Sequence, residues 1–371
     1  MWGISGRQRP DRGNKMKMAF LYSMAGSGRR MRIIFAAFTA LAAFALVPDV
    51  SFAGETLARV RAKGVVRCGV GQGLAGLAFR DGSGRWTGIE PDFCRAVAAA
   101  VLNDPEKVAL VPMTPSARFP RLLSGEVDLL LRSTTWTLGR EAFLGVEFAG
   151  VLYHDGQAFM VPRKSKVRRI ADLNGSAICL VKGTTHVENA TDYFGSRGLR
   201  YKGAIFDTVE DAKKAFLAGK CAAFTSDYIQ LSADRASATG GPEEFVILPD
   251  LISREPVGPV VRRGDEEWFA IVKWVLFALI EAEDRGITKA NVRAKAKTAA
   301  DPSLRRFLGL TGGFGKALGV RDDWTIKVIE SVGNYGEMFE RNLGRQGPLK
   351  IERGVNRPWT KGGILYAPPF R

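Results

Sequence analysis

The chain has 371 residues, of which 54 are Lys or Arg and 38 are Asp or Glu, so its formal net charge at neutral pH is +16. Such a basic balance can indicate a nucleic-acid or lipid partner. However, acidic and basic residues alternate along most of the chain, and no basic run is interleaved with aromatic residues. We therefore interpret the surface as solvated, with a mild bias toward anionic partners, and expect no nucleic-acid binding.

The N-terminal segment has the three-part layout of a secretory signal. Residues 1–32 are basic, 33–47 are apolar, and the small residues Ser51 and Ala53 precede Gly54, where cleavage is expected. The apolar run of fifteen residues is short for a membrane span, which needs roughly 20. An interfacial helix that stays attached is the alternative. Because the basic part is long for a signal, alternative translation starts are Met16, Met18, Met24 and Met31.

Removal of residues 1–53 leaves 46 basic and 36 acidic residues, a net charge of +10. The remaining 318 residues are too many for one simple core, so two domains are expected. No later stretch of about 18 apolar residues lacks charges, which predicts a soluble, exported protein.

Four cysteines in an exported chain predict disulfides, and four cysteines allow three pairings. Pairing each cysteine with its nearer partner gives Cys68–Cys94 and Cys179–Cys221, one local bridge in each half. The chain has no C-x-x-C spacing, so neither a zinc site nor a dithiol redox site is expected.

Strands and helices alternate along the chain, which predicts an α/β fold. Residues 71–76 form a glycine-rich loop whose N–H groups could meet an anion, although glycines are also ordinary turn residues. In chain order the pattern predicts a helix at 55–63, a strand at 65–70, a hairpin or loop at 81–88, a helix at 91–102, a strand at 107–113, a helix at 118–123, and strands at 127–131 and 177–181.

The stretch from Ser133 to Arg140 directly follows the buried strand predicted at 127–131. Ligands of open α/β sheets bind at the carboxyl ends of strands. Hydroxyl groups there supply neutral hydrogen bonds, and the arginine fork matches a carboxylate. The alternative is an ordinary strand-to-helix turn with capping threonines and a solvated arginine.

These residues resemble family 3 extracellular solute-binding proteins of ABC transporters, and within that family the general L-amino-acid-binding proteins. The similarity runs from about residue 55 to the C-terminus. It rests on Arg118-Phe119-x-x-Leu122-x-x-Gly125-x-Val127-Asp128, Thr135-x-Thr137-x-x-Arg140, Asp92-Phe93-Cys94, Tyr153-His154-Asp155-Gly156-Gln157, Glu255-Pro256-Val257-Gly258-Pro259, Gly333-Asn334-Tyr335-Gly336-Glu337-Met338, and Tyr366-Ala367-Pro368-Pro369.

The resemblance implies a two-lobed clamshell, the periplasmic-binding-protein fold, with the ligand held between α/β lobes. After the signal at 1–53, residues 54–157 would begin lobe 1 and residues 158–252 would form lobe 2. Residues 253–371 would return to lobe 1 and add a C-terminal extension. The two crossings near 155–160 and 250–260 would be the hinge.

The resemblance also implies roles for individual residues. Arg140 would hold the ligand α-carboxylate with help from Thr135, and the backbone carbonyl of Ser133 would face the α-ammonium. From the other lobe, Thr184 and Thr185 would place helix N–H groups at the carboxylate. Asp227 would bind the ammonium, so that a zwitterion is held by opposite charges from opposite lobes.

Departures from relatives concern the side-chain pocket. Gly73 stands where many specific relatives carry an aspartate, and Gly76 and Pro115 stand where they carry an aromatic clamp, which would leave an open pocket and favour broad specificity. Lys182 and His186 are further candidates for the pocket lining, although an exposed lysine and a histidine on the helix surface are the favoured interpretations. Trp136 is interpreted as a core residue rather than a pocket wall.

We therefore expect a periplasmic, monomeric binding protein that delivers L-amino acids to a membrane permease. No cofactor, metal or catalytic residue is expected, so it would not be an enzyme. A cyclohexadienyl dehydratase on the same fold is the alternative, but it needs a general acid in the cleft that the matched positions do not supply. A membrane receptor's sensing domain would need a following transmembrane segment, and none is seen before Arg371.

Overall fold

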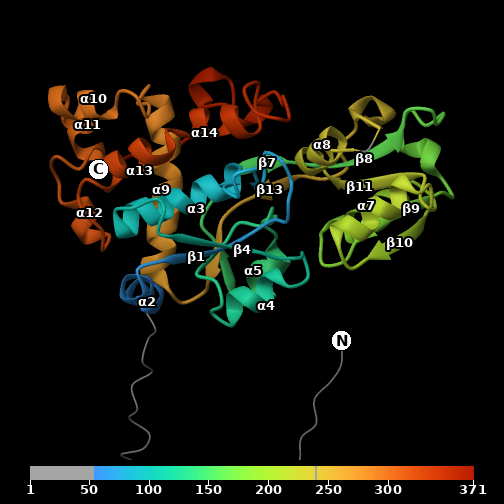
Figure 1. Ribbon diagram of the computed structural model, residues 1–371, viewed down its shortest axis with the longest axis horizontal. Coiled ribbons are helices and arrows are strands. Elements are labelled where there is room, and N and C mark those ends of the chain that lie inside the picture. The colour runs from blue at the N-terminus through green and yellow to red at the C-terminus, as the bar shows by residue number, and fades with distance from the viewer. Residues whose placement is uncertain (1–53, 239) are drawn as a thin grey trace, which may run out of the picture. The chain divides into compact units, whose positions relative to one another are not determined.

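A computed structural model describes residues 54–238 and 240–371 of the chain, so the predicted signal at 1–53 lies outside the described residues. Figure 1 shows two α/β lobes, with further helices from the C-terminal part of the chain on the side of the first lobe away from the second. Each lobe contains a five-stranded sheet. Within the described ranges, no helix is long and apolar enough to span a bilayer.

Lobe 1 is built on the sheet β4-β1-β5-β14-β6. Strands β4, β1 and β5 are parallel, and β14 runs antiparallel to both neighbours. Its elements are β1 (Val66–Val70), β4 (Val108–Pro112), β5 (Leu129–Leu130), β6 (Val146–Phe148), β14 (Val260–Arg262), the hairpin of β2 (Phe79–Arg80) and β3 (Trp86–Thr87), and the helices α2 (Glu55–Lys63), α3 (Ile89–Leu102), α4 (Arg118–Leu123) and α5 (Leu138–Leu144).

Lobe 2 is built on the sheet β10-β9-β11-β8-β12. Strands β10, β9 and β11 are parallel, and β8 is antiparallel to β11 and β12. Its elements are β8 (Gln157–Pro162), β9 (Ala177–Val181), β10 (Lys202–Phe206), β11 (Ala223–Asp227), β12 (Phe245–Ile247), the helices α6 (His186–Gly195), α7 (Val209–Leu217) and α8 (Tyr228–Ala236), and the 3-10 turns η1 (Ile170–Leu173) and η2 (Pro242–Glu244).

Two short strands pair where the chain passes between the lobes. Strand β7 (Tyr153–Asp155) runs antiparallel to β13 (Glu255–Val257), and Asp155 lies opposite Glu255. Strand β7 leads into β8 of lobe 2, whereas β13 leads back to β14 of lobe 1. The fold therefore has two chain crossings side by side.

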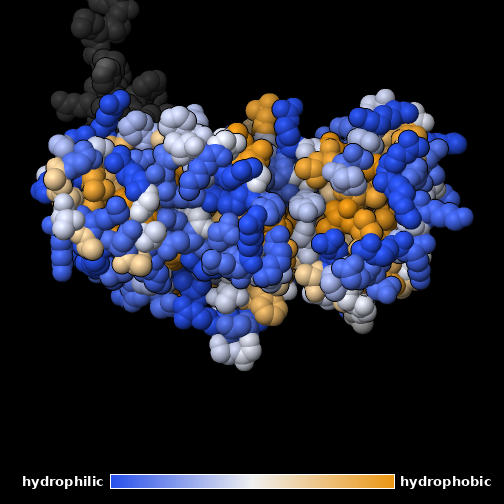
Figure 2. Space-filling view, turned by 90° about the horizontal axis from the view of Figure 1, so that it is seen from above, coloured by the Kyte–Doolittle hydropathy of each residue, from blue (hydrophilic) through white to orange (hydrophobic). Residues whose placement is uncertain are grey.

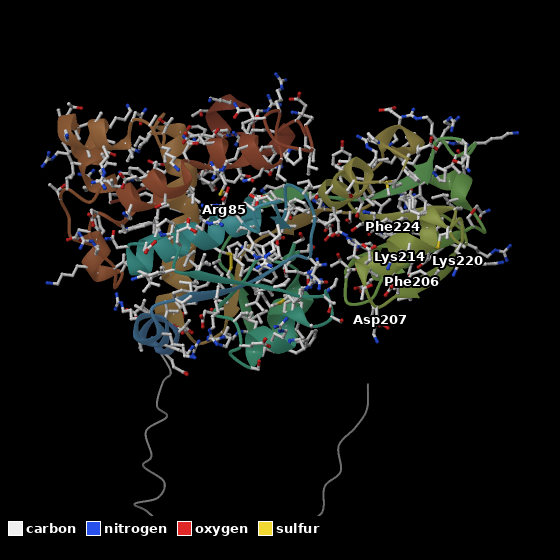
Figure 3. All side chains as sticks on the ribbon, in the orientation of Figure 1. Arg85, Phe206, Asp207, Lys214, Lys220 and Phe224 are labelled. Carbon is white, nitrogen blue, oxygen red and sulfur yellow. A yellow bond between two sulfur atoms is a disulfide. The ribbon has the colours of Figure 1, made fainter. Side chains whose placement is uncertain are left out.

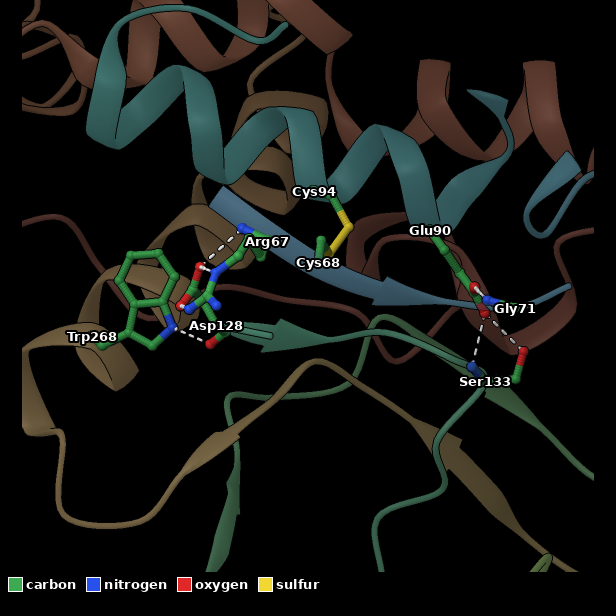
Figure 4. Close-up of a disulfide and its surroundings, with 8 residues drawn as sticks. All are labelled: Arg67, Cys68, Gly71, Glu90, Cys94, Asp128, Ser133 and Trp268. Carbon is green, nitrogen blue, oxygen red and sulfur yellow. Dashed lines mark hydrogen bonds and ion pairs between the residues drawn. A yellow bond between two sulfur atoms is a disulfide. The ribbon is translucent and has the colours of Figure 1, made fainter. Parts of the chain in front are cut away.

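The C-terminal helices share one hydrophobic core with lobe 1. Helix α3 packs against α13 and α9, and the common core includes Phe93, Trp268 and Trp324. The indole Nε1 of Trp268 donates to the carbonyl of Asp128 at 2.8 Å, which ties α9 to lobe 1 (Figure 4). These elements are α9 (Glu266–Asp284), α10 (Val292–Thr298), α11 (Pro302–Phe307), α12 (Phe314–Ala317), α13 (Trp324–Val332), α14 (Tyr335–Asn342), η3 (Gly354–Asn356) and η4 (Trp359–Lys361).

Local sequence explains most of these elements. Helix α9 begins where Asp265 accepts the N–H of Trp268, and the structure keeps the predicted bounds of α2 and β9. Helix α3 begins at Ile89, two residues before the predicted start, because two acidic residues favour its first turn. Figure 2 shows a mainly hydrophilic face on which apolar residues gather in separate patches.

Each lobe contains one disulfide. Cys68 of β1 is joined to Cys94 of α3, and Cys179 of β9 is joined to Cys221, which follows α7. This is the nearest-neighbour pairing. The first bridge joins β1 to the body of α3, and the second joins β9 to the segment between α7 and β11, so each holds its own lobe together and neither links the two crossings.

The carboxylate of Asp234 on α8 is buried beside the ammonium group of Lys213 on α7, 3.4 Å away. Burial raises the pKa of Asp234 to about 6, and Glu210 adds to the increase, whereas Lys213 and Arg132 oppose it. Between about pH 4 and 6 the folded protein therefore binds a proton that the unfolded chain has lost. The free energy of unfolding should fall as pH rises through this window, by at most about 1.4 kcal/mol per pH unit from this group.

Asp234→Asn should flatten this fall, because the amide does not titrate. Urea unfolding at several pH values between about 4 and 7 measures the effect. Asp250→Asn, which changes an exposed carboxylate in the same half, is the control and should keep the wild-type slope. An Asp234→Asn variant that loses stability as steeply as the wild type would contradict the assignment.

Candidate functional site

A narrow cleft lies between the carboxyl ends of parallel strands from both lobes. The segment at 133–135 follows β5, the segment at 184–186 follows β9, and Asp227 ends β11. About 310 Å³ of the cleft is free of atoms, including open solvent. Its lining residues are Pro115, Arg118, Arg132, Ser133, Thr135, Arg140, Val181, Thr184, Thr185, His186, Val209, Ser226, Asp227 and Gln230.

The cleft brings together all six residues expected to bind the ligand directly, three from each lobe. From lobe 1 come Ser133, Thr135 and Arg140, and from lobe 2 come Thr184, Thr185 and Asp227. Ser133 and Asp227 are 94 residues apart in the sequence, yet both line the cleft, because the segments that follow strands of the two sheets meet there.

Arg140 is held at the start of α5. The Thr137 hydroxyl caps this helix by accepting the N–H of Arg140 at 3.2 Å. The Nη1 of Arg140 donates to the carbonyl of Thr135 at 2.5 Å, and the guanidinium lies 5.5 Å from the ring centroid of Phe119. Burial lowers the pKa of Arg140, while Glu255 and Asp227 oppose the decrease. The side chain is thus fixed by backbone and ring contacts, with its planar fork at the cleft.

Ser133 is held by a buried carboxylate that sequence reasoning left unexplained. Glu90 on α3 is 1% exposed, and its Oε1 accepts from the N–H and the Oγ of Ser133 at 2.7 and 2.9 Å. Its Oε2 accepts the N–H of Gly71 at 2.7 Å (Figure 4). Ser133 has φ of 34°, an unusual value for a residue with a side chain. Glu90 therefore joins the loop after β1 to the loop after β5 and supports a strained backbone at the cleft.

The threonine hydroxyls of lobe 2 already have partners inside the protein. The Thr184 hydroxyl donates to the carbonyl of Val181 at 2.7 Å, and the Thr185 hydroxyl donates to Oε2 of Glu255 at 2.9 Å. The second bond connects lobe 2 to the return crossing. What these residues offer to the cleft is therefore the N-terminal end of α6, whose first N–H groups and dipole favour an anion.

Asp227 and His186 form a buried pair at the lobe 2 side of the cleft. Asp227 Oδ1 lies 3.0 Å from His186 Nε2, and the two residues are 5% and 4% exposed. The interpretation of His186 as a helix-surface residue is wrong. As the first residue of α6, it lies against the end of β11, and its carbonyl accepts from Gln157 Nε2 at 3.2 Å.

A further buried carboxyl group, that of Asp155, lies close to this pair. Asp155 ends β7, and burial, followed by the charge of Asp227, raises its pKa well above the usual range. Its Oδ1 and Oδ2 accept the N–H groups of Gly156 and Ile229. These bonds fix the crossing strand next to the first turn of α8.

Three residues that were candidates for the pocket lining are not among the residues that line the cleft. A Cβ atom on Gly76 would meet the carbonyl of Asn342 at 2.7 Å, so the C-terminal segment covers this loop, and Gly73 does not line the cleft either. The side chain of Lys182 is 68% exposed and lies 3.9 Å from Asp207, which belongs to lobe 2 (Figure 3). It is the exposed lysine that the sequence favoured.

Trp136 was expected in the core, and this expectation is wrong. It is 37% exposed and stacks on Phe148 with ring centroids 5.7 Å apart. It directly follows the site threonines and precedes α5, so it covers the end of β6 instead of entering the core of lobe 1.

Two buried arginines line the cleft that were not expected there. Arg118 and Arg132 are 2% and 4% exposed. Arg118 Nη2 crosses the cleft to the carbonyl of Gly183 at 3.0 Å, and Arg132 Nε donates to the carbonyl of Met113 at 3.2 Å. Burial, then the charges of Arg140 and Arg132, lowers the pKa of Arg118 well below its usual range. The sequence signal was weak, because an arginine at a helix start or strand end is ordinarily solvated.

The arrangement is suited to binding rather than to chemistry. The lining contains three guanidinium groups and one carboxylate, with the carboxylate and one helix N-terminus on lobe 2. These groups can hold an anion and a cation of one small ligand at once. In the described part of the chain, no group of three or more acidic, His or Cys side chains is placed to hold a metal ion.

Comparisons with known proteins agree with this geometry. A family model of bacterial extracellular solute-binding proteins, family 3, matches residues 66–286. The general L-amino acid-binding periplasmic protein AapJ of Rhizobium johnstonii is 48% identical over 318 residues, which cover 85% of this chain and 93% of AapJ. The glutamate/glutamine/aspartate/asparagine-binding protein BztA of Rhodobacter capsulatus is 43% identical over 334 residues, which cover 90% and 98% of the two chains.

A solved structure is also similar over most of the chain. It is an ABC transporter periplasmic binding protein from Brucella ovis with glutathione bound, 44% identical, with a TM-score of 0.83 and coverage of 85% of this chain and 99% of its own. The expected two-lobed α/β fold is thereby confirmed. These three relatives are binding proteins, so they give the dehydratase alternative no support.

Proposed function

Because this chain belongs to family 3 of the bacterial extracellular solute-binding proteins, we propose that it captures L-amino acids in the periplasm and delivers them to the permease of an ABC transporter. The observation that carries this proposal is the pairing of Arg140 with Asp227, opposite charges from opposite lobes that line one cleft. A zwitterion needs one partner of each sign. Residues 1–53 would direct the export, and the protein would act as a monomer.

The ligand α-carboxylate would lie between Arg140 and the first N–H groups of α6, next to Thr184 and Thr185, with Thr135 as an additional donor. Asp227 and the carbonyl of Ser133 would receive the α-ammonium. Because these groups come from both lobes, the ligand makes its full set of contacts only when the lobes are closed. That differential contact is what drives a ligand-dependent closure.

Closure would take place at the two paired crossings, between a first lobe of 54–157 with 253–371 and a second lobe of 158–252. The β7–β13 pair is short, and neither disulfide spans it. A few residues at the ends of these strands would absorb the change in backbone angles.

Charge in the cleft favours ligands with a second carboxylate. Arg118 and Arg132 remain after Arg140 is assigned to the α-carboxylate, and the buried Arg118 is repelled by the charges of Arg140 and Arg132, which outweigh those of Asp227 and Glu90. A neutral zwitterion does not relieve this repulsion, whereas an acidic side chain does. Glutamate and aspartate would therefore bind best within a broader set of amino acids. Gly73 and Gly76 do not support the expectation of broad ligand specificity, because neither residue lines the cleft.

Calorimetric titration with a panel of L-amino acids tests the proposal, on protein unfolded and refolded with its disulfides intact so that carried-over ligand is removed. We expect micromolar binding of several amino acids, and glutamate tighter than glutamine by about tenfold or more. Arg132→Gln should reduce that ratio, whereas Arg121→Gln, at an exposed arginine paired with Glu126, should not. No binding to any member would overturn the function, and equal binding of glutamate and glutamine would overturn only the acidic preference.

A further inference from the structure

A second cavity lies among the C-terminal helices, apart from the cleft. About 720 Å³ of this space is free of atoms, including open solvent, which is the measure that gives about 310 Å³ for the cleft. Apart from Trp274, its lining comes from residues beyond 286, where the family model ends. The lining residues are Trp274, Arg306, Phe307, Gly309, Phe314, Gly315, Ala317, Leu318, Asp322, Trp324, Thr325, Pro369, Phe370 and Arg371.

Five aromatic residues contribute to the wall. The ring centroid of Phe370 lies 5.0 Å from those of Trp274 and Phe307, in edge-to-face contacts. Trp324 of α13 is buried, while Phe314 of α12 is 40% exposed. Apolar cavities of comparable size bind small arenes. The wall therefore suits a flat, apolar group.

Arg306 brings a positive charge to the cavity lining. Its Nε is covered by protein atoms and has no hydrogen bond within the described part of the chain, whereas the residue as a whole is only partly buried. The acidic residue of this lining, Asp322, accepts the N–H of Lys316 at 3.0 Å. The polar part of the cavity thus favours an anion.

We propose that this cavity is a second binding site, for a small aromatic carboxylate. The ring would lie among Trp274, Phe307 and Phe370, and the carboxylate would accept a charge-assisted hydrogen bond from Arg306. An apolar wall with one convergent cationic group is the composition that small-molecule sites share. The site is independent of the amino-acid cleft, because the two linings have no residue in common.

Phenylacetate is the probe, and phenethylamine, which carries an ammonium on the same ring, is its matched control. Calorimetry and ligand-observed NMR on the refolded protein should show saturable binding of phenylacetate to one site. Phenethylamine should bind at least about tenfold more weakly, because its charge has the wrong sign for Arg306. Absence of saturable binding, or equal binding of the two probes, would overturn the proposal.

Variants locate the site. Arg306→Gln should weaken phenylacetate binding by about tenfold or more, and Ala317→Phe, which adds bulk to the lining, should reduce it too. Arg305→Gln removes the same charge one position away, outside the lining, and should leave binding unchanged. Arg140→Ala should also leave it unchanged, since that residue serves the cleft. Loss of phenylacetate binding in Arg140→Ala would mean that the probe binds in the cleft, and wild-type binding in Arg306→Gln would mean that it does not bind at Arg306. Either result would overturn the proposal. The affinity of Arg306→Gln for glutamate shows whether that variant is folded.

Discussion

Arg140→Ala is expected to weaken the binding of L-amino acids by roughly 3 kcal/mol or more, which is more than about a hundredfold in the dissociation constant. We propose that this guanidinium, which donates to the carbonyl of Thr135 and lines the cleft together with the start of α6, receives the ligand carboxylate. Its removal would leave a desolvated carboxylate without its main partner. Calorimetric titration with glutamate and with glutamine measures the loss.

Arg121→Ala is the matched control, because Arg121 is a partly exposed arginine on α4 that pairs with Glu126 away from the cleft lining. It should bind as the wild type does. The melting temperature of Arg140→Ala should change little, since the side chain makes one hydrogen bond to the backbone. An Arg140→Ala protein with wild-type affinity would mean that the ligand carboxylate is bound elsewhere.

Glu90→Ala is expected to lower the free energy of unfolding by roughly 3–5 kcal/mol and to weaken ligand binding as well. The buried carboxylate accepts from two backbone N–H groups and one hydroxyl, at Gly71 and Ser133. Alanine leaves these donors unpaired away from water. It also removes the support for the unusual backbone angle of Ser133, whose carbonyl is proposed to face the ligand ammonium.

The Glu188→Ala variant tests whether Glu90 stabilises the protein through its buried hydrogen bonds or only as an acidic residue at a helix N-terminus. Both glutamates lie in the first turn of a helix, but Glu188 is exposed on α6. The dipole contributes about 0.3–1 kcal/mol at such a position, so Glu188→Ala should cost no more than that. Urea unfolding of both variants gives the comparison. Equal losses would show that the buried bonds of Glu90 contribute little.

Much of the site could be read from the sequence because its parts follow strands. Hydroxyl residues and Arg140 come directly after the strand at β5, and Asp227 ends β11, so the α/β pattern already places them at carboxyl ends. The family resemblance then pairs the two lobes. The structure brings the six expected residues to one cleft, although their roles toward a ligand stay predictions.

The sequence could not predict which groups are buried by residues that are far away along the chain. Glu90 looks like an ordinary first-turn acid until Gly71 and Ser133 fold onto it. Gly76 looked like open pocket space, but the segment near Asn342 packs against it more than 250 residues later in the chain.

The sequence by itself determined the order of strands and helices, because hydrophobic periodicity and capping act within a few residues. It also determined which residue types follow each strand. Tertiary structure alone decided that Arg118 and Arg132 are buried at the cleft, that His186 is buried against Asp227, and that Trp136 is on the surface. The free energy of a charged or aromatic side chain depends on the groups that surround it, and these come from chain segments that no local pattern connects.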